Sequence, residues 1–138
     1  MRNEIKGSRD DLFGFGIQTV ATFAYPFGDY DDTTDRIVRE LGFSGARTSD
    51  GGYNTKQDNR YLLKRRDASV STSASTIKSW IDKATQDKLW LIINFHRIDN
   101  SGNSYTYSPE KLQEIVNYLV TKNVRVVTLR EGVSLMTP

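Results

Sequence analysis

Two segments of the chain end in residues whose types suit a chemical site. The first is Thr22–Tyr30, where a short apolar run leads into the turn Pro26-Phe27-Gly28. The second is Leu91–Ile98, where a longer apolar run leads into His96, the only histidine of the chain. An imidazole exchanges protons near neutral pH, so His96 is a candidate general acid. No cysteine is present, which excludes disulfides, thiolate nucleophiles and Cys-ligated zinc.

Both candidate features also have an ordinary structural interpretation. His96 equally fits a strand-end histidine that bonds a backbone carbonyl, and Pro26-Phe27-Gly28 equally fits a plain turn. Four aspartates follow that turn: Asp29, Asp31, Asp32 and Asp35. They lack the glycine and the distal glutamate of a calcium loop, and they fit the start of a helix better than a cation site.

Several aromatic residues are placed by the pattern around them. Trp80 lies on the apolar face of a predicted helix and Trp90 lies inside an apolar run, so both are predicted to be core. Four tyrosines fall in predicted loops, where they fit either a carbohydrate groove or ordinary loop positions: Tyr25, Tyr30, Tyr53 and Tyr107.

Length and charge narrow the class of protein. The 138 residues suit one domain, predicted over residues 1–138. The net charge of +2 gives no strong attraction to nucleic acid, and the basic run Lys64-Arg65-Arg66 is predicted to be a solvated surface. No apolar run approaches the ~20 residues of a membrane span. Met1–Lys6 lacks the apolar stretch of a signal peptide, and the cellular location stays undetermined.

The elements that must position these residues alternate between helix and strand. Helices are predicted over 3–15, from Asp32 or Thr33 to Leu41, from Ser73 or Ser75 to Lys88, and from Ser108 to Asn123. Strands are predicted over 19–23, 43–47, 89–95 and 124–129, with another beginning near Tyr61 and a short tail over 131–136. The longest, 89–95, is apolar enough to be covered on both faces.

This alternation predicts an α/β fold with mostly parallel strands and right-handed crossovers. Parallel sheets hold their ligands at the carboxyl ends of the strands. The turn Pro26-Phe27-Gly28 and His96 each follow a strand, so the pattern predicts that both lie on the same rim.

The residues Phe23–Tyr30 and Leu91–Ile98 resemble the third and fifth motifs of the NodB-type polysaccharide deacetylases, carbohydrate esterase family 4. Gly45–Thr48 and Val126–Leu129 also fit, so the resemblance covers nearly the whole chain in order. It implies a distorted (β/α) barrel, of which this chain would be a partial, C-terminal portion. The family hydrolyses N- or O-acetyl groups on carbohydrate polymers with a divalent metal, usually zinc.

The resemblance also implies roles for individual residues. His96 would be the general acid for the leaving amine. The loop Tyr25, Pro26, Phe27 and Gly28 would bind substrate, and the N–H of Phe27 would face the oxyanion. An aspartate would tune His96, and Asp50, Asp58 and Asp67 are equal candidates.

The chain departs from the family where the metal is held. The family's Asp-Asp pair and His-x-x-x-His lie before the position that matches Asn3, and no histidine precedes His96. A two-histidine metal site therefore cannot be built from this chain, and no metal ligands or cofactor are assigned to it. Ala24 stands where many members have arginine, and Arg97 stands where aspartate is frequent.

Three functions remain in view. The first is a polysaccharide deacetylase-like hydrolase that is inactive or nearly so without a complementing chain. The second is a non-catalytic module that binds a carbohydrate polymer or oligosaccharide, and the third is a structural or partner-binding domain. A partial barrel leaves open strand edges, so self-association is also predicted.

Overall fold

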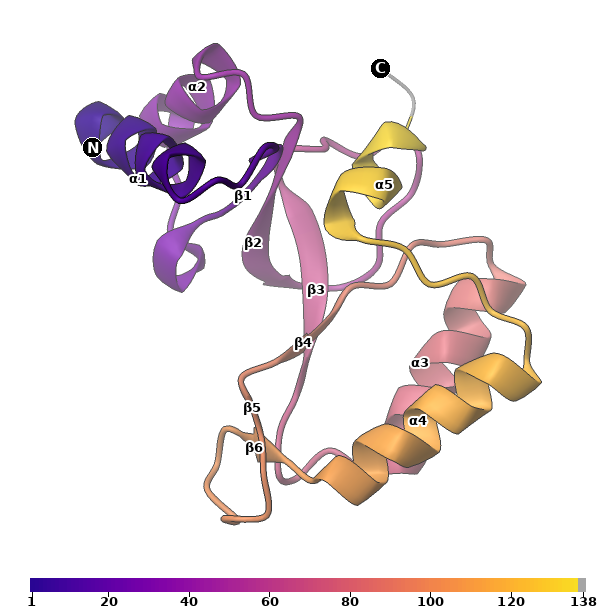
Figure 1. Ribbon diagram of the computed structural model, residues 1–138. Helices are drawn as coiled ribbons and strands as arrows, with labels where there is room; N and C mark the ends of the chain where they lie inside the picture. Colours follow the sequence, from indigo (N-terminus) through magenta and orange to yellow (C-terminus); the bar gives the residue numbers. More distant parts are fainter. Residues whose placement is uncertain (137–138) are drawn as a thin grey trace. The chain divides into compact units, whose positions relative to one another are not determined.

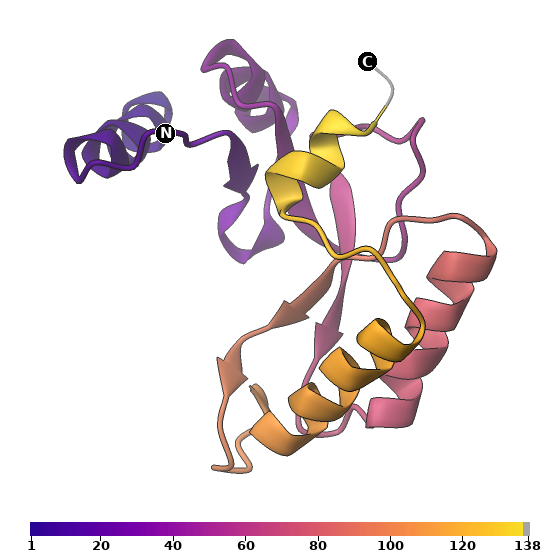
Figure 2. The same cartoon turned by 45° about the vertical axis from the view of Figure 1, so that its right-hand side comes forward.

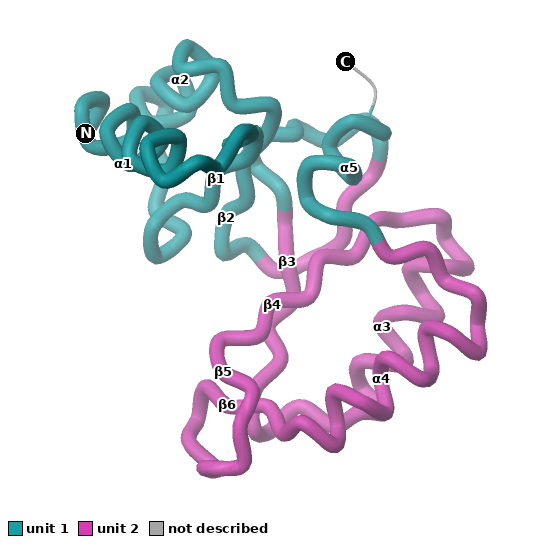
Figure 3. Tube along the Cα trace, viewed as in Figure 1, with its two compact units in different colours: residues 1–50, 56–63, 127–138 teal, residues 51–55, 64–126 magenta. Residues whose placement is uncertain are grey.

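The computed structural model describes residues 1–136 and divides the chain into two compact units. Unit 1 combines three separate stretches: Met1–Asp50, Lys56–Leu63 and the described residues from Val127 onward. Unit 2 consists of Gly51–Thr55 and Lys64–Val126 (Figure 3).

Unit 1 is built around a pair of parallel strands. Its elements are α1 (Arg2–Gly14), β1 (Thr22–Ala24), the 3-10 turn η1 (Pro26–Gly28), α2 (Asp32–Glu40), β2 (Gly45–Gly51, whose last residue belongs to unit 2) and α5 (Leu129–Ser134). β1 and β2 pair with Thr22 opposite Gly45 and Ala24 opposite Arg47 (Figure 1). The side chain of Val133, in α5, packs against Gly45 so closely that a Cβ there would lie 2.8 Å from Val133 Cγ2.

The core of unit 1 lies between this strand pair and helices α1 and α2. Its buried residues are Ile5, Tyr25, Ile37, Val38, Phe43 and Ala46. Asp31 begins α2 as its N-cap, because its carboxylate accepts the backbone N–H of Thr34 at 2.7 Å. The sequence placed this cap at Asp32 or Thr33, one or two residues too late. Leu41, the predicted end of the helix, is its C-cap residue, and Gly42 follows with φ +81.

Unit 2 packs two helices together beside its strands. Its elements are β3 (Leu63–Ala68, whose first residue belongs to unit 1), α3 (Ala74–Gln86), β4 (Ile93–Phe95), β5 (Arg97–Ile98), β6 (Thr106–Tyr107) and α4 (Pro109–Thr121). β3 pairs with β4 and β5 pairs with β6, both in parallel. α3 and α4 lie side by side in both views (Figure 1 and Figure 2).

The starts of α3 and α4 are those that the sequence predicts. Ser73 accepts the N–H of Thr76, and Ser108 accepts the N–H of Lys111 ahead of Pro109. Both helices contribute to the core of unit 2, whose buried members are Ala68, Ile77, Ile81, Tyr107 and Ile115. Trp80 packs partly buried against this core.

Two predicted strands differ from the structure. Residues 124–128 form no strand, and Leu129–Ser134 is a helix that opens with a capping box between Thr128 and Glu131. The apolar run 89–95 is a strand only over Ile93–Phe95, and all seven of its residues are half-buried rather than covered on both faces. Trp90 instead forms an isolated antiparallel bridge with Asn54.

Polar stretches supply the strand residues that apolar patterning did not predict. β2 continues through Thr48–Gly51, beyond the predicted strand 43–47. β1 is confined to Thr22–Ala24, whereas the predicted strand spans 19–23. The basic run Lys64-Arg65-Arg66 lies inside β3 rather than on a solvated surface. Arg65 is buried there and forms an ion pair with Asp67.

The observed class is mixed α/β with parallel strand pairs, which confirms the coarse prediction. Within residues 1–136, none of the helices has the length and apolar character that a membrane crossing requires.

Candidate functional site

The turn after β1 holds an exposed aromatic residue in a rare backbone conformation. Phe27 has φ 57°, in the left-handed region, and is 98% exposed. The Gly28 N–H closes the turn by donating to the Tyr25 carbonyl at 2.9 Å. The Phe27 side chain gains no burial that would offset the unfavourable φ. A non-glycine residue in this region costs about 1 kcal/mol or more, and such strain concentrates at functional sites.

The residues around the turn hold it in place. Ser49, in β2, donates its hydroxyl to the Phe27 carbonyl at 3.1 Å. The N–H of Tyr25 donates to the Arg47 carbonyl at 3.1 Å and so continues the β1–β2 ladder into the turn. The Phe27 N–H is not part of these bonds, which makes it the backbone donor on which the resemblance depends.

Tyr25 anchors the turn from beneath. Its side chain is only 2% exposed, and its hydroxyl donates to Asp35 at 3.5 Å. Burial, together with the negative charge of Asp35, raises the pKa of Tyr25 to about 12. The Tyr25 ring packs edge-on against Phe23. Because the side chain is buried, only the backbone of Tyr25 could contact a ligand.

His96 follows β4 in unit 2 and faces one aspartate. Its Nε2 lies 3.6 Å from Oδ1 of Asp67, and both side chains are nearly half exposed. The parallel register sets Asp67 opposite Asn94, two residues before His96. Of the three aspartates that the sequence offered, Asp67 is the one that the fold places beside the imidazole. Asp50 instead accepts the Tyr30 hydroxyl at 3.4 Å.

Asp67 is held by more than the histidine. Asn94 donates its amide to Asp67 Oδ1 at 2.9 Å, and Arg65 forms an ion pair with the same oxygen. Two donor groups and the imidazole therefore lie against one carboxylate oxygen, which fixes the Asp67 side chain in place. An imidazole beside such a carboxylate is oriented for proton transfer.

Sequence patterning missed Tyr105 and misplaced Tyr107. The ring of Tyr105 lies 5.3 Å from the imidazole of His96 and is 67% exposed. Tyr107 was grouped with the loop tyrosines, but it is buried in β6 and packs against Phe95. Only the pairing of β5 with β6, which brings residues 105–107 back past His96, distinguishes the two.

The candidate residues do not form a zinc site. Residues 1–136 contain no group of three or more His, Cys, Asp or Glu side chains arranged for a metal. The chain's one histidine is already paired with Asp67 and Tyr105. The residues present therefore do not fit the two-histidine, one-aspartate centre that the resemblance implies.

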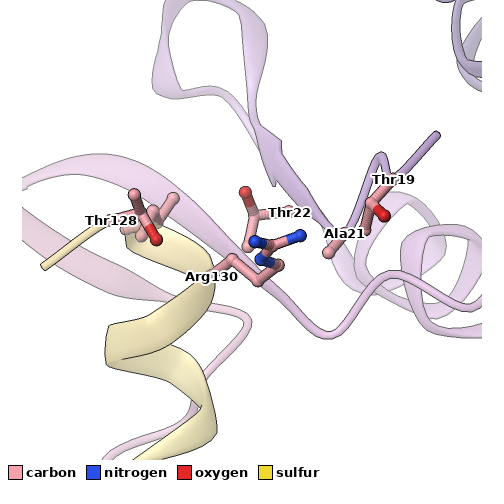
Figure 4. Close-up of a pocket in the computed structure, with 6 residues that line it drawn as sticks. Thr19, Ala21, Thr22, Thr128 and Arg130 are labelled. Carbon is pink, nitrogen blue, oxygen red and sulfur yellow. The ribbon is translucent and has the colours of Figure 1, made fainter. Parts of the chain in front are cut away.

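The two predicted halves of the site belong to different units. Tyr25, Pro26, Phe27 and Gly28 are in unit 1, and His96 is in unit 2. Unit 1 also has an open pocket of about 210 Å³, lined by Thr19, Ala21, Thr22, Thr128, Leu129 and Arg130 (Figure 4). None of the predicted site residues lines this pocket.

No protein-family model, curated protein or solved structure matches the chain. The class of the fold therefore rests on the geometry above, and any function has to be argued from the residues.

Proposed function

We propose that this chain is a polysaccharide deacetylase-like protein that carries the general-acid part of a deacetylation site on a partial (β/α) barrel. The observation that supports this most directly is the pairing of His96 with Asp67 at the ends of neighbouring parallel strands. Ligand sites of parallel sheets lie at such strand ends. The strained, exposed turn at Phe27 is a second feature that suits a site.

In the proposed reaction, water adds to the carbonyl carbon of an acetyl group on the sugar. The resulting oxyanion requires a hydrogen-bond donor, which is the role that the resemblance implies for the Phe27 N–H. The carbon–nitrogen bond then breaks, and protonated His96 gives its proton to the departing amine. Asp67 orients the imidazole and stabilises its positive charge before the transfer.

The described residues hold no group of three or more His, Cys, Asp or Glu side chains that could bind a metal to activate the water. We therefore expect the purified chain to be inactive or nearly so on its own. Turnover is expected only when a second polypeptide supplies the missing Asp and His ligands.

The test is an acetate-release assay on N-acetyl chito-oligosaccharide with added zinc. The chain is assayed alone and with a separate polypeptide that bears an Asp-Asp pair and a His-x-x-x-His. We expect acetate only from the mixture, and at least a hundredfold less from a mixture containing His96→Asn, the scale of one general acid. The proposal is wrong if the chain alone releases acetate, or if the mixture releases acetate at the same rate with His96→Asn as with the unaltered chain.

A non-catalytic carbohydrate-binding module is the second candidate. It is favoured by Tyr105, an exposed ring beside His96 of the kind on which sugars stack. Calorimetry with chitin and peptidoglycan fragments tests it. Binding that Tyr105→Ala abolishes and His96→Asn retains supports the module, and an absence of binding at millimolar sugar excludes it.

A further inference from the structure

Arg130 brings to the open pocket of unit 1 a positive charge that no carboxylate of the described residues neutralises. The residue belongs to α5, and its side chain extends toward Thr22 in the close-up of the pocket (Figure 4). Within residues 1–136 its guanidinium takes part in no hydrogen bond and no ion pair. An arginine offers five N–H donors in a planar fork that matches the oxygens of an anion, so these donors are available to a ligand.

Two threonine hydroxyls in the same pocket also have no partner in the described part of the chain. Thr19 lies on the segment that leads into β1, and Thr22 lies on β1 itself. The third lining threonine, Thr128, is already occupied, because its hydroxyl donates to Glu131 Oε2 at 2.8 Å and accepts the Glu131 N–H at 3.2 Å. The pocket therefore combines one guanidinium with two free hydroxyl donors.

The described residues that line the pocket include no acid. Arg130 is the only one of them that carries a charge, and no Asp or Glu occurs in the sequence between Asp11 and Asp29. Glu131 follows Arg130 in the chain, but its carboxylate accepts the backbone N–H and the hydroxyl of Thr128 in the capping box. An anion in the pocket would therefore meet a positive charge and no carboxylate among these lining side chains.

The number of donors favours a phosphate group over a carboxylate. A guanidinium can give two parallel N–H bonds, and each of the two hydroxyls can give one more. A carboxylate offers two oxygens, whereas a phosphate group offers three strong acceptor oxygens. The pocket volume of about 210 Å³ is also several times the ~30 Å³ that a water molecule occupies in the liquid. A phosphate group therefore has room there, together with part of a molecule that carries it.

We propose that this pocket binds a phosphate group, either as the free ion or as a phosphate monoester of a small molecule. Arg130 donates two N–H groups to two phosphate oxygens, and the hydroxyls of Thr19 and Thr22 donate to the remaining acceptor positions. All the lining residues belong to unit 1, and the inference does not depend on the proposed deacetylase function.

Nitrogen-15 NMR of the unaltered chain tests where phosphate binds. Inorganic phosphate is titrated to tens of millimolar at low ionic strength, because added salt screens the attraction. We expect the amide signals of residues 19–22 and 128–130 to shift together and to saturate. The signals of α2, which contributes no lining residue, should stay in place.

Two variants test the donors. Arg130→Gln removes the charge and Thr22→Val removes one hydroxyl, and each should weaken phosphate binding at least tenfold, since a hydrogen bond to a charged group is lost. Arg36→Gln is the matched control, because Arg36 is an exposed arginine of α2 in the same unit and loses the same charge. Its phosphate affinity should change by less than about twofold. Circular dichroism checks that each variant is folded.

Two further probes distinguish the possible ligands. If glucose 6-phosphate binds more tightly than inorganic phosphate, the pocket takes a monoester, and if it binds equally or more weakly, the pocket takes the free ion. Acetate, a carboxylate, should bind at least tenfold more weakly than inorganic phosphate.

Three results would overturn the inference. They are acetate binding as tight as that of phosphate, phosphate binding that Arg130→Gln leaves unchanged, and a titration in which the lining residues show no saturable shift. The last measurement uses the unaltered chain, so it decides the matter even if a variant does not fold.

Discussion

Gly28 and Ser49 approach so closely that a Cβ atom on Gly28 would lie 2.0 Å from the Oγ of Ser49. The same Ser49 hydroxyl donates to the carbonyl of Phe27, the strained residue of the turn. Ser49 therefore covers Gly28 and fixes Phe27 at once. The position next to the exposed aromatic ring has to be glycine both for its φ of +83 and for the space it leaves.

We predict that Gly28→Ala destabilises the chain more than a substitution that changes φ preference alone. Gly16→Ala is the matched control, because Gly16 also lies in unit 1, has φ +86 and has no atom within 4 Å of an added Cβ. The control should lose about 1 kcal/mol of unfolding free energy. Gly28→Ala should lose at least about 2 kcal/mol more, since Ser49 must also move. Urea unfolding measures both, and equal losses would contradict the close approach.

Replacing Phe27 with asparagine should stabilise the chain. Asparagine tolerates positive φ, and the Phe27 side chain is too exposed to lose packing, so we expect a gain of about 0.5–1 kcal/mol. Phe15→Asn is the control, because Phe15 is also exposed but has an ordinary φ of −81. Its stability should change by less than about 0.5 kcal/mol. A destabilised Phe27→Asn in thermal unfolding would argue against a strained turn.

Asn54 should be among the most sensitive polar positions of unit 2. It is fully buried, and its side chain accepts the Lys64 N–H and donates to the Lys64 carbonyl. Asn54→Ala leaves both backbone groups without partners, which should cost about 2–4 kcal/mol. Asn103→Ala, on an exposed loop, should cost less than about 0.5 kcal/mol in the same urea unfolding experiment. Similar losses of unfolding free energy for the two variants would show that the Asn54 side chain does not stabilise the backbone at Lys64.

The hydroxyl of Tyr25 should make stability depend on pH in the alkaline range. Its pKa rises from 10.0 to about 12 in the folded chain, so folding favours the neutral hydroxyl. The resulting stabilisation is complete below pH 10 and is lost as the pH rises to 12. Tyr25→Phe should flatten this decline, measured by urea unfolding at successive pH values. Burial also raises the pKa of Tyr107, and this contribution is present in the unaltered chain and in Tyr25→Phe alike. If stability declined identically with pH in the two proteins, the assignment to Tyr25 would be refuted.

The pairing with Asp67 should select one tautomer of neutral His96. Asp67 lies beside Nε2, so the proton should reside on Nε2 and leave Nδ1 as the acceptor. Nitrogen-15 NMR shifts distinguish the tautomers, and the signals are unambiguous because the chain has one histidine. Asp67→Asn, with a weaker acceptor, should reduce the Nε2–H fraction. Asp11→Asn, on exposed α1, should leave it unchanged; a predominant Nδ1–H form in the unaltered chain would contradict the pairing.

Local signals in the sequence were sufficient for the starts of α3 and α4. Ser73, and Ser108 ahead of Pro109, mark helix starts through bonds to residues three positions later, so nothing distant is needed to recognise them. Strands depend on a neighbour that local patterning cannot supply. Residues 124–128 look like a strand but pair with nothing in the described chain, whereas the charged residues of β3 form one because β4 lies beside them.

The same distinction applies to the candidate site. His96 and the turn at Phe27 were recognisable by residue type and spacing. The choice of Asp67 over Asp50 and Asp58 was not, because it follows from the register that sets Asp67 opposite Asn94. Tyr105 was missed for a similar reason: its place beside His96 depends on β5 and β6, two-residue strands too short to show a pattern.

The three-part make-up of unit 1 has a consequence for how the chain is made. During translation, nearly all of unit 2 leaves the ribosome before the last stretch of unit 1, which begins at Val127. Until Val133 arrives to pack against Gly45, the strand pair of unit 1 lacks its cover. The first unit, although it begins to be synthesised earlier, should therefore complete its packing after the second.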